Sequence, residues 1–291
     1  MHYSGSVVRP PYEARSVLLE LTVGCSHNKC TFCNYYRDDR FRLAPMEQIQ
    51  EDLQEIRDFN PNISHIFAVG ADPFVMSFDK LNAIAKKVRE YLPLTDISMY
   101  ARITNIVDKT VDQLKELRQN GIHEVVIGVE SGDDEVLRNV NKGYTSSDII
   151  KQCHKLDEAG ITYRIIYICG LAGQGKCVES AKKSAQVFNQ INATHMILTS
   201  LTLMPETELY SDYQEGKFQQ VSELERIQEL LSMIQNLTGE ITILGNHVSN
   251  SVGFDAELPK DKDKTVKLLQ NAIDEFDEDA FRKRRERLNI I

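Results

Sequence analysis

The chain has 291 residues, of which 42% are hydrophobic and 26% are charged, and its formal net charge is −9. This length can bury a full core without disulfide staples, and six cysteines are too few for a disulfide scaffold. No apolar run reaches the roughly 20 residues of a membrane helix, and the N-terminal residues lack a secretory apolar core, so we expect a cytoplasmic protein outside the membrane.

The first predicted strand, residues 16–22, is short and apolar, and Gly24 ends it. Three cysteines follow within nine residues, Cys25, Cys30 and Cys33. Thiolate sulfur is the preferred ligand of iron–sulfur clusters and of zinc. A protein in a reducing compartment gains nothing structural from clustered thiols, so the pattern predicts a metal site.

Two kinds of metal site are compatible with three cysteines. No fourth cysteine or paired histidine follows at zinc-finger spacing, although His27 could complete a closed zinc site. An open [4Fe–4S] cluster, with three irons held by the protein and one left for another ligand, fits the pattern better. A zinc site with four protein ligands is the alternative.

Three closely spaced cysteines after a first strand, with Phe32 just before the last, resemble the signature of the radical S-adenosylmethionine superfamily. This resemblance implies that Cys25, Cys30 and Cys33 hold the cluster, that S-adenosylmethionine binds the remaining iron, and that Phe32 lies near the adenine. In that family the reduced cluster cleaves S-adenosylmethionine to a 5′-deoxyadenosyl radical, which takes a hydrogen from the substrate. Four residues separate Cys25 from Cys30, where the usual signature has three.

Strands and helices then alternate through the first 210 residues. Their almost wholly apolar strands predict a parallel sheet covered by helices. A flat doubly wound sheet and a barrel share this pattern, and the family resemblance implies the barrel. We therefore expect an α/β fold, a partial (β/α)6 TIM-type barrel over residues 1–210, with an α-rich C-terminal extension over 211–291 that closes it. The predicted strands are 16–22, 63–69, 97–103, 123–129, 162–169 and 194–203, and the predicted helices are 45–59, 79–91, 111–118, 145–159 and 176–190.

The residues just past each strand are polar. In a flat doubly wound sheet and in a barrel alike, such residues gather at one edge of the sheet. Gly70, Ala71 and Asp72, followed by Pro73, resemble the family's Gly-Gly-Glu-Pro motif, whose backbone holds the amino group of S-adenosylmethionine. A bare backbone allows carbonyl groups to approach a ligand closely. The alternative is an ordinary turn marked by Gly and Pro.

Arg102 and Glu130 end the third and fourth predicted strands, where charges are costly unless they are paired or bound to a ligand. Both positions resemble family sites that contact the methionyl carboxylate or the ribose, with Ser131 alongside. The alternative is an Arg102–Glu130 ion pair. The stretch 128–145 resembles the branch that contains the Elongator catalytic subunit, methylthiotransferases and oxygen-independent coproporphyrinogen oxidases.

The segment from Gly170 to Cys177, GLAGQGKC, fits the spacing of a phosphate-binding P-loop between a strand and a helix. Cys177 replaces the hydroxyl residue that such a loop uses for magnesium. The segment also resembles the Gly-Leu-Pro-Gly turn of radical enzymes, which makes Gly170 a cofactor-binding candidate, with Leu203 at the end of the sixth strand. Nucleotide triphosphate binding stays an alternative.

Cys169, Cys177 and His247 are the remaining catalytic candidates, and none is assigned firmly. Either cysteine could face the cavity as a hydrogen donor or nucleophile, but a lone cysteine is more often a buried small hydrophobe. His247 could act as an acid or base, or it could cap a surface turn.

Residues after 210 predict a helix opened by a capping box at 222–225 and a short strand at 241–244. The basic run 282–287 follows the acidic run 274–279, which suits a solvated terminal helix better than a nucleic-acid clamp.

The sequence thus predicts a radical S-adenosylmethionine enzyme with one [4Fe–4S] cluster that acts on a small molecule or a peptide. An electron donor such as flavodoxin or ferredoxin is the implied partner. A tRNA- or nucleic-acid-modifying enzyme is the alternative. The net charge of −9 disfavours it, because a phosphate backbone is also negatively charged. A zinc- or nucleotide-binding regulatory protein is a further alternative.

Overall fold

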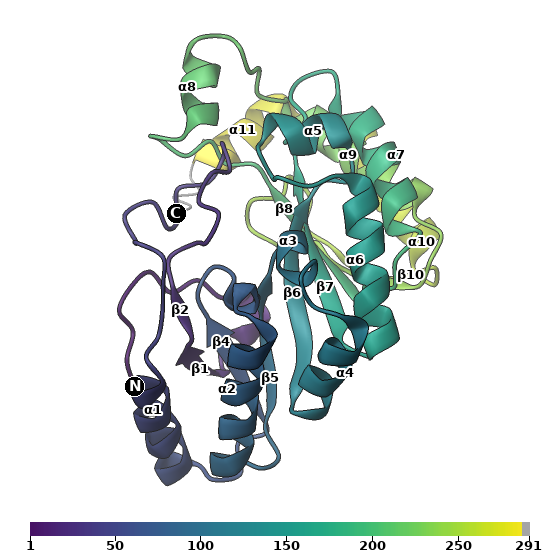
Figure 1. Ribbon diagram of the computed structural model, residues 1–291. Coiled ribbons are helices and arrows are strands. Elements are labelled where there is room, and N and C mark those ends of the chain that lie inside the picture. Colours follow the sequence, from purple (N-terminus) through teal and green to yellow (C-terminus); the bar gives the residue numbers. More distant parts are fainter. Residues whose placement is uncertain (287–291) are drawn as a thin grey trace. The chain divides into compact units, whose positions relative to one another are not determined.

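The computed structural model describes residues 1–286, and the chain forms two compact units (Figure 1). The first unit contains residues 1–28, 34–128 and 152–163, and the second contains 29–33, 129–151 and 164 onward. The chain crosses between the units inside the cysteine loop, so neither unit is one continuous segment. The division at residue 210 that the sequence predicts stays a prediction.

The first unit holds a parallel arrangement of strands, with Leu19 opposite Ala68 and Ile66 opposite Ile97. Most of their side chains are buried, as expected of strands covered on both faces. The predicted strand 16–22 is too long, because the chain leaves this sheet after Glu20 and pairs with a later segment instead. The strands are β1 (Val17–Glu20), β2 (Thr22–Val23), β3 (Arg42–Leu43), β4 (His65–Val69), β5 (Asp96–Ala101) and β6 (Ile122–Glu130).

The helices α1 and α2 of the first unit lie side by side (Figure 1). In α1 the apolar spacing of Ile49, Leu53 and Ile56 predicts the buried face correctly. The third predicted strand ends too late, because Arg102 N–H donates to Asn105 Oδ1 and a short helix begins at Ile103. The helices are α1 (Met46–Phe59), α2 (Phe78–Tyr91), α3 (Ile103–Ile106) and α4 (Val111–Gln119), with short 3₁₀ turns at Pro11–Glu13 and Pro73–Val75. Helix α6 (Ser146–Ala159) opens at the predicted Thr145–Asp148 capping box and contributes to both units.

The second unit continues the pattern with parallel strands and adds an antiparallel one. The main sheet has the strand order β1-β4-β5-β6-β7-β8-β9-β10, and β10 pairs antiparallel with β9. The predicted strands 162–169 and 241–244 are confirmed, whereas the sixth predicted strand ends at Ser200 instead of Leu203. The elements are α5 (Asp134–Asn139), β7 (Thr162–Cys169), α7 (Cys177–Phe188), β8 (His195–Ser200), α8 (Glu208–Gln214), α9 (Glu223–Asn236), β9 (Ile241–Leu244), β10 (Asp255–Leu258), α10 (Lys262–Asp274) and α11 (Glu278–Glu286).

Helix α9 is the main helix of the C-terminal part, and it packs against α7 and α10 (Figure 1). Ser222 caps it as predicted, because the Glu225 N–H donates to the Ser222 hydroxyl at 3.1 Å. In α11 the exposed Arg282 pairs with Asp279 on the same helix, as a solvated helix does. The end of the predicted basic run, from residue 287, lies outside the described residues.

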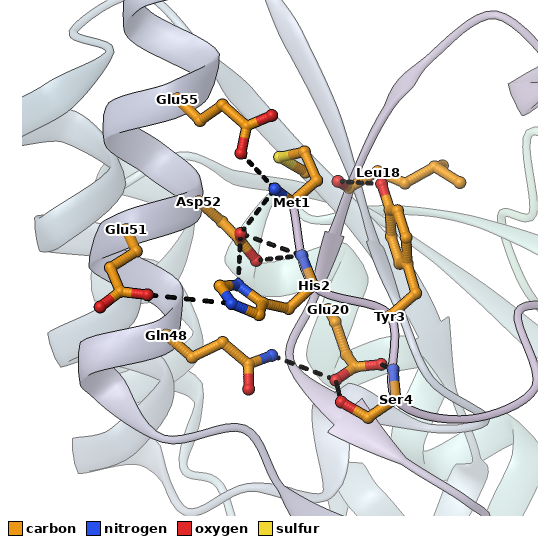
Figure 2. Close-up of polar contacts among 10 residues, drawn as sticks. All are labelled: Met1, His2, Tyr3, Ser4, Leu18, Glu20, Gln48, Glu51, Asp52 and Glu55. Carbon is orange, nitrogen blue, oxygen red and sulfur yellow. Dashed lines mark hydrogen bonds and ion pairs between the residues drawn. The ribbon is translucent and has the colours of Figure 1, made fainter.

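The N-terminal segment of the first unit lies against β1 and α1 (Figure 2). The Met1 amino group pairs with Asp52 and Glu55, and the His2 imidazole lies 2.8 Å from Asp52 Oδ1. Ser4 donates both its N–H and its hydroxyl to the buried Glu20 at the end of β1. The segment therefore covers the edge strand, whose exposed edge would otherwise invite pairing.

No helix within residues 1–286 is both long enough and apolar enough to cross a membrane.

Candidate functional site

The first half of the cysteine loop belongs to the first unit and turns at an asparagine. Asn28 has a φ of +43°, in the left-handed region that asparagine tolerates better than most residues. Its N–H donates to Cys25 Sγ at 3.3 Å, and its side-chain amide donates to the Tyr36 carbonyl at 3.1 Å. The turn shows how the one extra residue is accommodated, because the chain bends within the four residues between Cys25 and Cys30 while the Asn28 N–H donates to the Cys25 sulfur.

The second half of the loop, residues 29–33, belongs to the second unit and is held from α5. Thr31 N–H donates to the Val140 carbonyl at 3.3 Å, and the Asn141 amide donates to the Lys29 carbonyl at 3.0 Å. A turn closes between Cys30 and Cys33, whose backbone N and O lie 3.2 Å apart. The backbone around both cysteines is thus fixed by hydrogen bonds that involve no cofactor.

The six cysteines fall into two classes by exposure. Cys25, Cys30 and Cys33 are partly exposed, whereas Cys153, Cys169 and Cys177 are fully buried. The three partly exposed thiols are the predicted cluster ligands, and their soft sulfur donors fit an iron–sulfur cluster. In the described part of the chain no group of three or more His, Cys, Asp and Glu side chains is already arranged around a metal position, so the ligand set stays a prediction.

The turn after β4 approaches β2 so closely that only glycine fits. Gly70 has a φ of +128°, and a Cβ there would lie 1.9 Å from the Thr22 hydroxyl oxygen. Ala71 N–H donates to the Gly24 carbonyl at 3.4 Å, which joins the turn to the residue before Cys25. Gly70 and Ala71 therefore lie beside the start of the cysteine loop, as their predicted role requires.

Asp72 has a second connection to the loop that sequence reasoning missed. Its fully buried carboxylate accepts the Ser26 N–H at 3.1 Å and the Ser26 hydroxyl. The Asn105 amide donates to the same carboxylate at 3.5 Å, and Asn105 also accepts the N–H of the buried Arg102. Within the first unit, predicted residues Asp72 and Arg102 thus belong to one polar network that fixes the residue after Cys25.

Glu130 ends β6 in a strained backbone conformation. Its φ is +63°, which is unusual for a residue other than glycine and costs on the order of 1–3 kcal/mol. Its side chain is nearly buried, with Oε1 3.2 Å from Lys142 Nζ, while Oε2 has no hydrogen-bond partner. The structure gives Glu130 an ion pair with Lys142, a residue that no sequence pattern indicates. A buried carboxylate oxygen without a hydrogen-bond partner, at a strained strand end, is typical of a ligand-binding position.

Replacing Lys142 with Met should destabilise the protein strongly, because it leaves the buried Glu130 carboxylate without its cation. We expect a loss of about 3 kcal/mol in unfolding free energy, measured by urea denaturation. The double variant Glu130→Gln/Lys142→Met should recover most of this loss. Lys182→Met, which breaks an exposed pair with Glu179, should cost less than about 0.5 kcal/mol. Equal losses for the two lysine variants would contradict a desolvated Glu130–Lys142 pair.

Ser131 contributes to the structure of the turn after β6. Its hydroxyl accepts the Asp133 N–H at 3.1 Å and lies 3.3 Å from the Ser184 hydroxyl on α7. Ser184 also accepts the Gly132 N–H at 2.8 Å. These bonds account for the burial of Ser131, and they place the turn after β6 directly on α7.

Three predicted cofactor positions of the second unit gather at one place. Phe32 and Leu203 pack on the same apolar cluster, and Gly170 directly precedes Leu171, a member of it. The cluster is formed by residues that follow three strands, together with the cysteine loop. Its buried members are Val136, Val140, Leu171, Leu201 and Leu209, and Phe32, Ile168, Ala172, Leu203 and Phe218 pack against them.

The family model of the Radical SAM superfamily matches residues 19–181, more than half of the chain. The chain belongs to the radical SAM superfamily. Enzymes of this superfamily use a [4Fe–4S] cluster and S-adenosylmethionine, and this chain is an enzyme of that kind. The predictions of the superfamily, of a radical S-adenosylmethionine enzyme and of its two cofactors are therefore confirmed.

Known proteins similar to this radical SAM chain include the heme chaperone HemW of Bacillus subtilis. It is 23% identical over 203 residues, which are 66% of this chain and 52% of HemW. The chain therefore spans about half the length of the curated relatives it matches.

Solved radical SAM enzymes share the fold. The methyltransferase TsrM from Kitasatospora setae matches 69% of this chain and 39% of its own, with a TM-score of 0.57 and 16% identity. Coproporphyrinogen III oxidase HemN from Escherichia coli matches 76% of this chain and 51% of its own, with a TM-score of 0.55 and 18% identity. These matches confirm the predicted α/β fold class with its mostly parallel sheet.

Cys169 and Cys177 do not fit the catalytic roles considered for them in the radical SAM chain. Both side chains are fully buried, and burial raises the pKa of each thiol well above its usual range. Cys177 Sγ donates to the Gly173 carbonyl at 3.4 Å, so this side chain is not in the position of a magnesium-binding hydroxyl. Both residues are buried small side chains, which is the alternative considered for them. Cys153 is a third such residue, and burial raises the pKa of its thiol to about 12.

His247 caps its own turn in the second unit. The Nδ1 atom lies 2.7 Å from the Ser249 hydroxyl and accepts the Ser249 N–H at 3.2 Å. Partial burial lowers the pKa of the imidazole. These contacts favour the turn-capping alternative, and no catalytic role is carried forward for His247.

A cavity of about 520 Å³ lies in the second unit, between α5, the glycine turn after β7 and α8. Its apolar wall is shared with the cluster that holds Phe32, through Val136, Leu171 and Phe218. Lys176 and Lys183 at its edge pair with acidic residues, as Lys176 does with Glu135 at 2.9 Å. Its size is that of a small-molecule pocket.

Proposed function

We propose that this chain reductively cleaves S-adenosylmethionine and abstracts hydrogen from a small-molecule or peptide substrate. Superfamily membership supports this, since the matched region 19–181 contains the predicted cluster ligands and nearly all predicted cofactor residues. When bound, a reduced [4Fe–4S] cluster supplies the electron that breaks S-adenosylmethionine to methionine and a 5′-deoxyadenosyl radical. An electron donor of the flavodoxin or ferredoxin type supplies that electron to the cluster.

The roles of the protein residues follow from their chemistry. Cys25, Cys30 and Cys33 donate three thiolates and leave one iron position for another ligand. The Gly70–Ala71 turn has little side-chain bulk of its own and lies beside the start of the cysteine loop, where its main chain can approach a cofactor closely. Glu130 offers one carboxylate oxygen with no hydrogen-bond partner to a hydroxyl of the cofactor, and this buried acceptor is the observation that carries the proposal.

Anaerobic reconstitution with iron, sulfide, a reductant and S-adenosylmethionine tests this function. We expect about four irons and four sulfides per chain, and release of 5′-deoxyadenosine that chromatography detects. A protein that carries a full cluster and releases no 5′-deoxyadenosine would contradict the proposed chemistry. One tightly bound zinc per chain would instead support the zinc-stabilised alternative.

A heme-related role is a second candidate, favoured by the similarity to proteins named heme chaperone. A hemin titration followed by visible absorbance tests it, with the chain at micromolar concentration. A saturable Soret shift at one hemin per chain would support this role. A linear absorbance change without saturation, equal to that of an unrelated acidic protein, would contradict the heme-related role.

A further inference from the structure

Two buried charged residues of α9 contact the ends of two strands of the second unit, and one of them, Arg226, pairs with Glu223 at 3.7 Å. Glu229 and Arg226 lie one helical turn apart, and both side chains are almost completely buried. Burying charge is expensive unless hydrogen bonds and an opposite charge compensate it. The buried face of α9 combines apolar residues such as Ile227 with the polar Glu223 and Ser232, and the charges on it need specific partners.

Glu229 receives two hydrogen bonds from β7 and the residue after it. Its Oε2 accepts the Gly170 N–H at 2.7 Å, and its Oε1 accepts the Tyr167 hydroxyl at 2.8 Å. The Gly170 N–H can only donate, so this position requires an acceptor, whereas the Tyr167 hydroxyl can donate or accept. An ionised carboxylate accepts a stronger bond from the Gly170 N–H than a neutral glutamine amide does.

Arg226 bridges the two strand ends themselves. Its Nη1 donates to the Cys169 carbonyl and its Nη2 to the Leu201 carbonyl, each at 3.3 Å. Gly170, with a φ of +86°, makes room for this side chain, because a Cβ there would lie 2.6 Å from Nη1. The Leu201 N–H donates to the Cys169 carbonyl at 2.8 Å, which joins the same two ends directly.

We propose that Glu229 and Arg226 are positioning residues of the cofactor site, which hold the Gly170 turn and the Leu201–Leu203 segment in place for S-adenosylmethionine. Leu171 and Leu201 follow these anchored groups directly and belong to the apolar cluster on which Phe32 and Leu203 pack. A shift of either strand end would therefore move the apolar surface offered to the cofactor. The inference rests on the proposed function and adds a role for the C-terminal part of the chain.

The protonation state of Glu229 should be visible in the chemical shift of the Gly170 amide proton that it binds. Burial raises the pKa of this carboxyl to about 7, and the bonds from Tyr167 and Gly170 and the charge of Arg226 limit the rise. The titratable groups that face it are Tyr167 and Cys169 on β7, Cys177 on α7 and Arg226 on α9. Above pH 7 the ionised carboxylate accepts a stronger bond, so the Gly170 amide proton should move downfield as the pH rises.

Selective labelling isolates this amide, because Cys169–Gly170 is the one Cys–Gly pair in the sequence. Full-length protein labelled with carbonyl-¹³C cysteine and ¹⁵N glycine should give a single filtered amide signal. We expect that signal to titrate with a midpoint near pH 7 and to lose its titration in Glu229→Gln. A Gly170 signal at the same position in wild type and in Glu229→Gln at pH 8 would overturn the inference.

Binding of S-adenosylmethionine supplies the second readout, by anaerobic equilibrium dialysis with reconstituted protein at pH 8. Glu229→Gln should weaken binding about tenfold with unchanged iron content, because the neutral amide accepts a weaker bond from the Gly170 N–H than the carboxylate does. Tyr167→Phe is the matched control, since it removes the other bond to the same carboxylate and should change affinity less than about twofold. Equal affinities for wild type and Glu229→Gln, or equal weakening in both variants, would overturn the positioning role.

Two results separate this inference from the function on which it rests. If the wild-type protein binds no S-adenosylmethionine while the Gly170 signal titrates, the proposed function fails and the hydrogen-bond geometry stands. If Glu229→Gln does not fold, Arg226→Lys replaces it in the dialysis. That variant keeps the charge but cannot bridge both carbonyls, so an unchanged affinity would overturn the proposal.

Discussion

Replacement of Cys30 with Ala should abolish both the cluster and the cleavage of S-adenosylmethionine. Two thiolates cannot hold three irons of a [4Fe–4S] cluster, so the iron content should fall from about four per chain to below one. Release of 5′-deoxyadenosine should fall by at least about 100-fold, since no electron reaches the sulfonium. Iron analysis, visible absorbance and chromatography measure these effects on protein reconstituted in parallel with wild type.

Cys153→Ala is the matched control for this experiment. Cys153 is fully buried on α6, where its thiol packs as a small hydrophobe. Its replacement should reduce stability modestly and leave about four irons per chain, because no ligand is lost. A full cluster in Cys30→Ala would show that the ligands were misassigned, and cluster loss in both variants would point to general misfolding.

Gly70→Ala should be among the most destabilising single substitutions outside the apolar core. A Cβ would meet the Thr22 hydroxyl oxygen at 1.9 Å and the Thr22 carbonyl oxygen at 2.6 Å, at a φ of +128°. The combined strain and overlap should cost about 4 kcal/mol of unfolding free energy. Urea denaturation followed by circular dichroism measures this loss.

Gly160→Ala separates the overlap from the backbone strain. Gly160 also has a positive φ, of +71°, but a Cβ there would meet nothing within 4 Å. Its replacement should cost only about 1 kcal/mol. If the two alanine variants lose the same stability, the close approach of the β4 turn to Thr22 does not exist in solution.

The helices and most strands could be predicted from sequence because their signals are local. Helix α1 shows apolar residues at helical spacing, and a side chain of Thr145 or Ser222 caps the helix that follows it. The run 162–169 is apolar apart from Thr162 and Arg164, and it forms β7 with the predicted bounds. Errors fall where a partner distant in sequence decides the outcome. Thr22 leaves the main sheet because Leu43 pairs with it, and β10 exists because β9 accepts it.

The same distinction applies to the candidate site. The three cysteines, the turn at Gly70 and the charge at Glu130 are visible in sequence because clustered thiols, glycines and charges beside apolar strands are locally anomalous. Sequence could not assign Lys142 as the partner of Glu130, or predict that Asp72 holds Ser26. For Cys169 the tendency of lone cysteines to be buried favoured the buried thiol, and the structure shows one.

The amino-acid sequence by itself thus determined the superfamily, the alternation of strands and helices, and the candidate ligands of the cluster. Only the tertiary structure decided which buried charges meet, above all that Glu229 and Arg226 of α9 bind the ends of β7 and β8. The reason is physical: periodicity and capping depend on neighbours within a few residues. The partner of a buried charge depends on which distant segments exclude water together, and no local pattern records that choice.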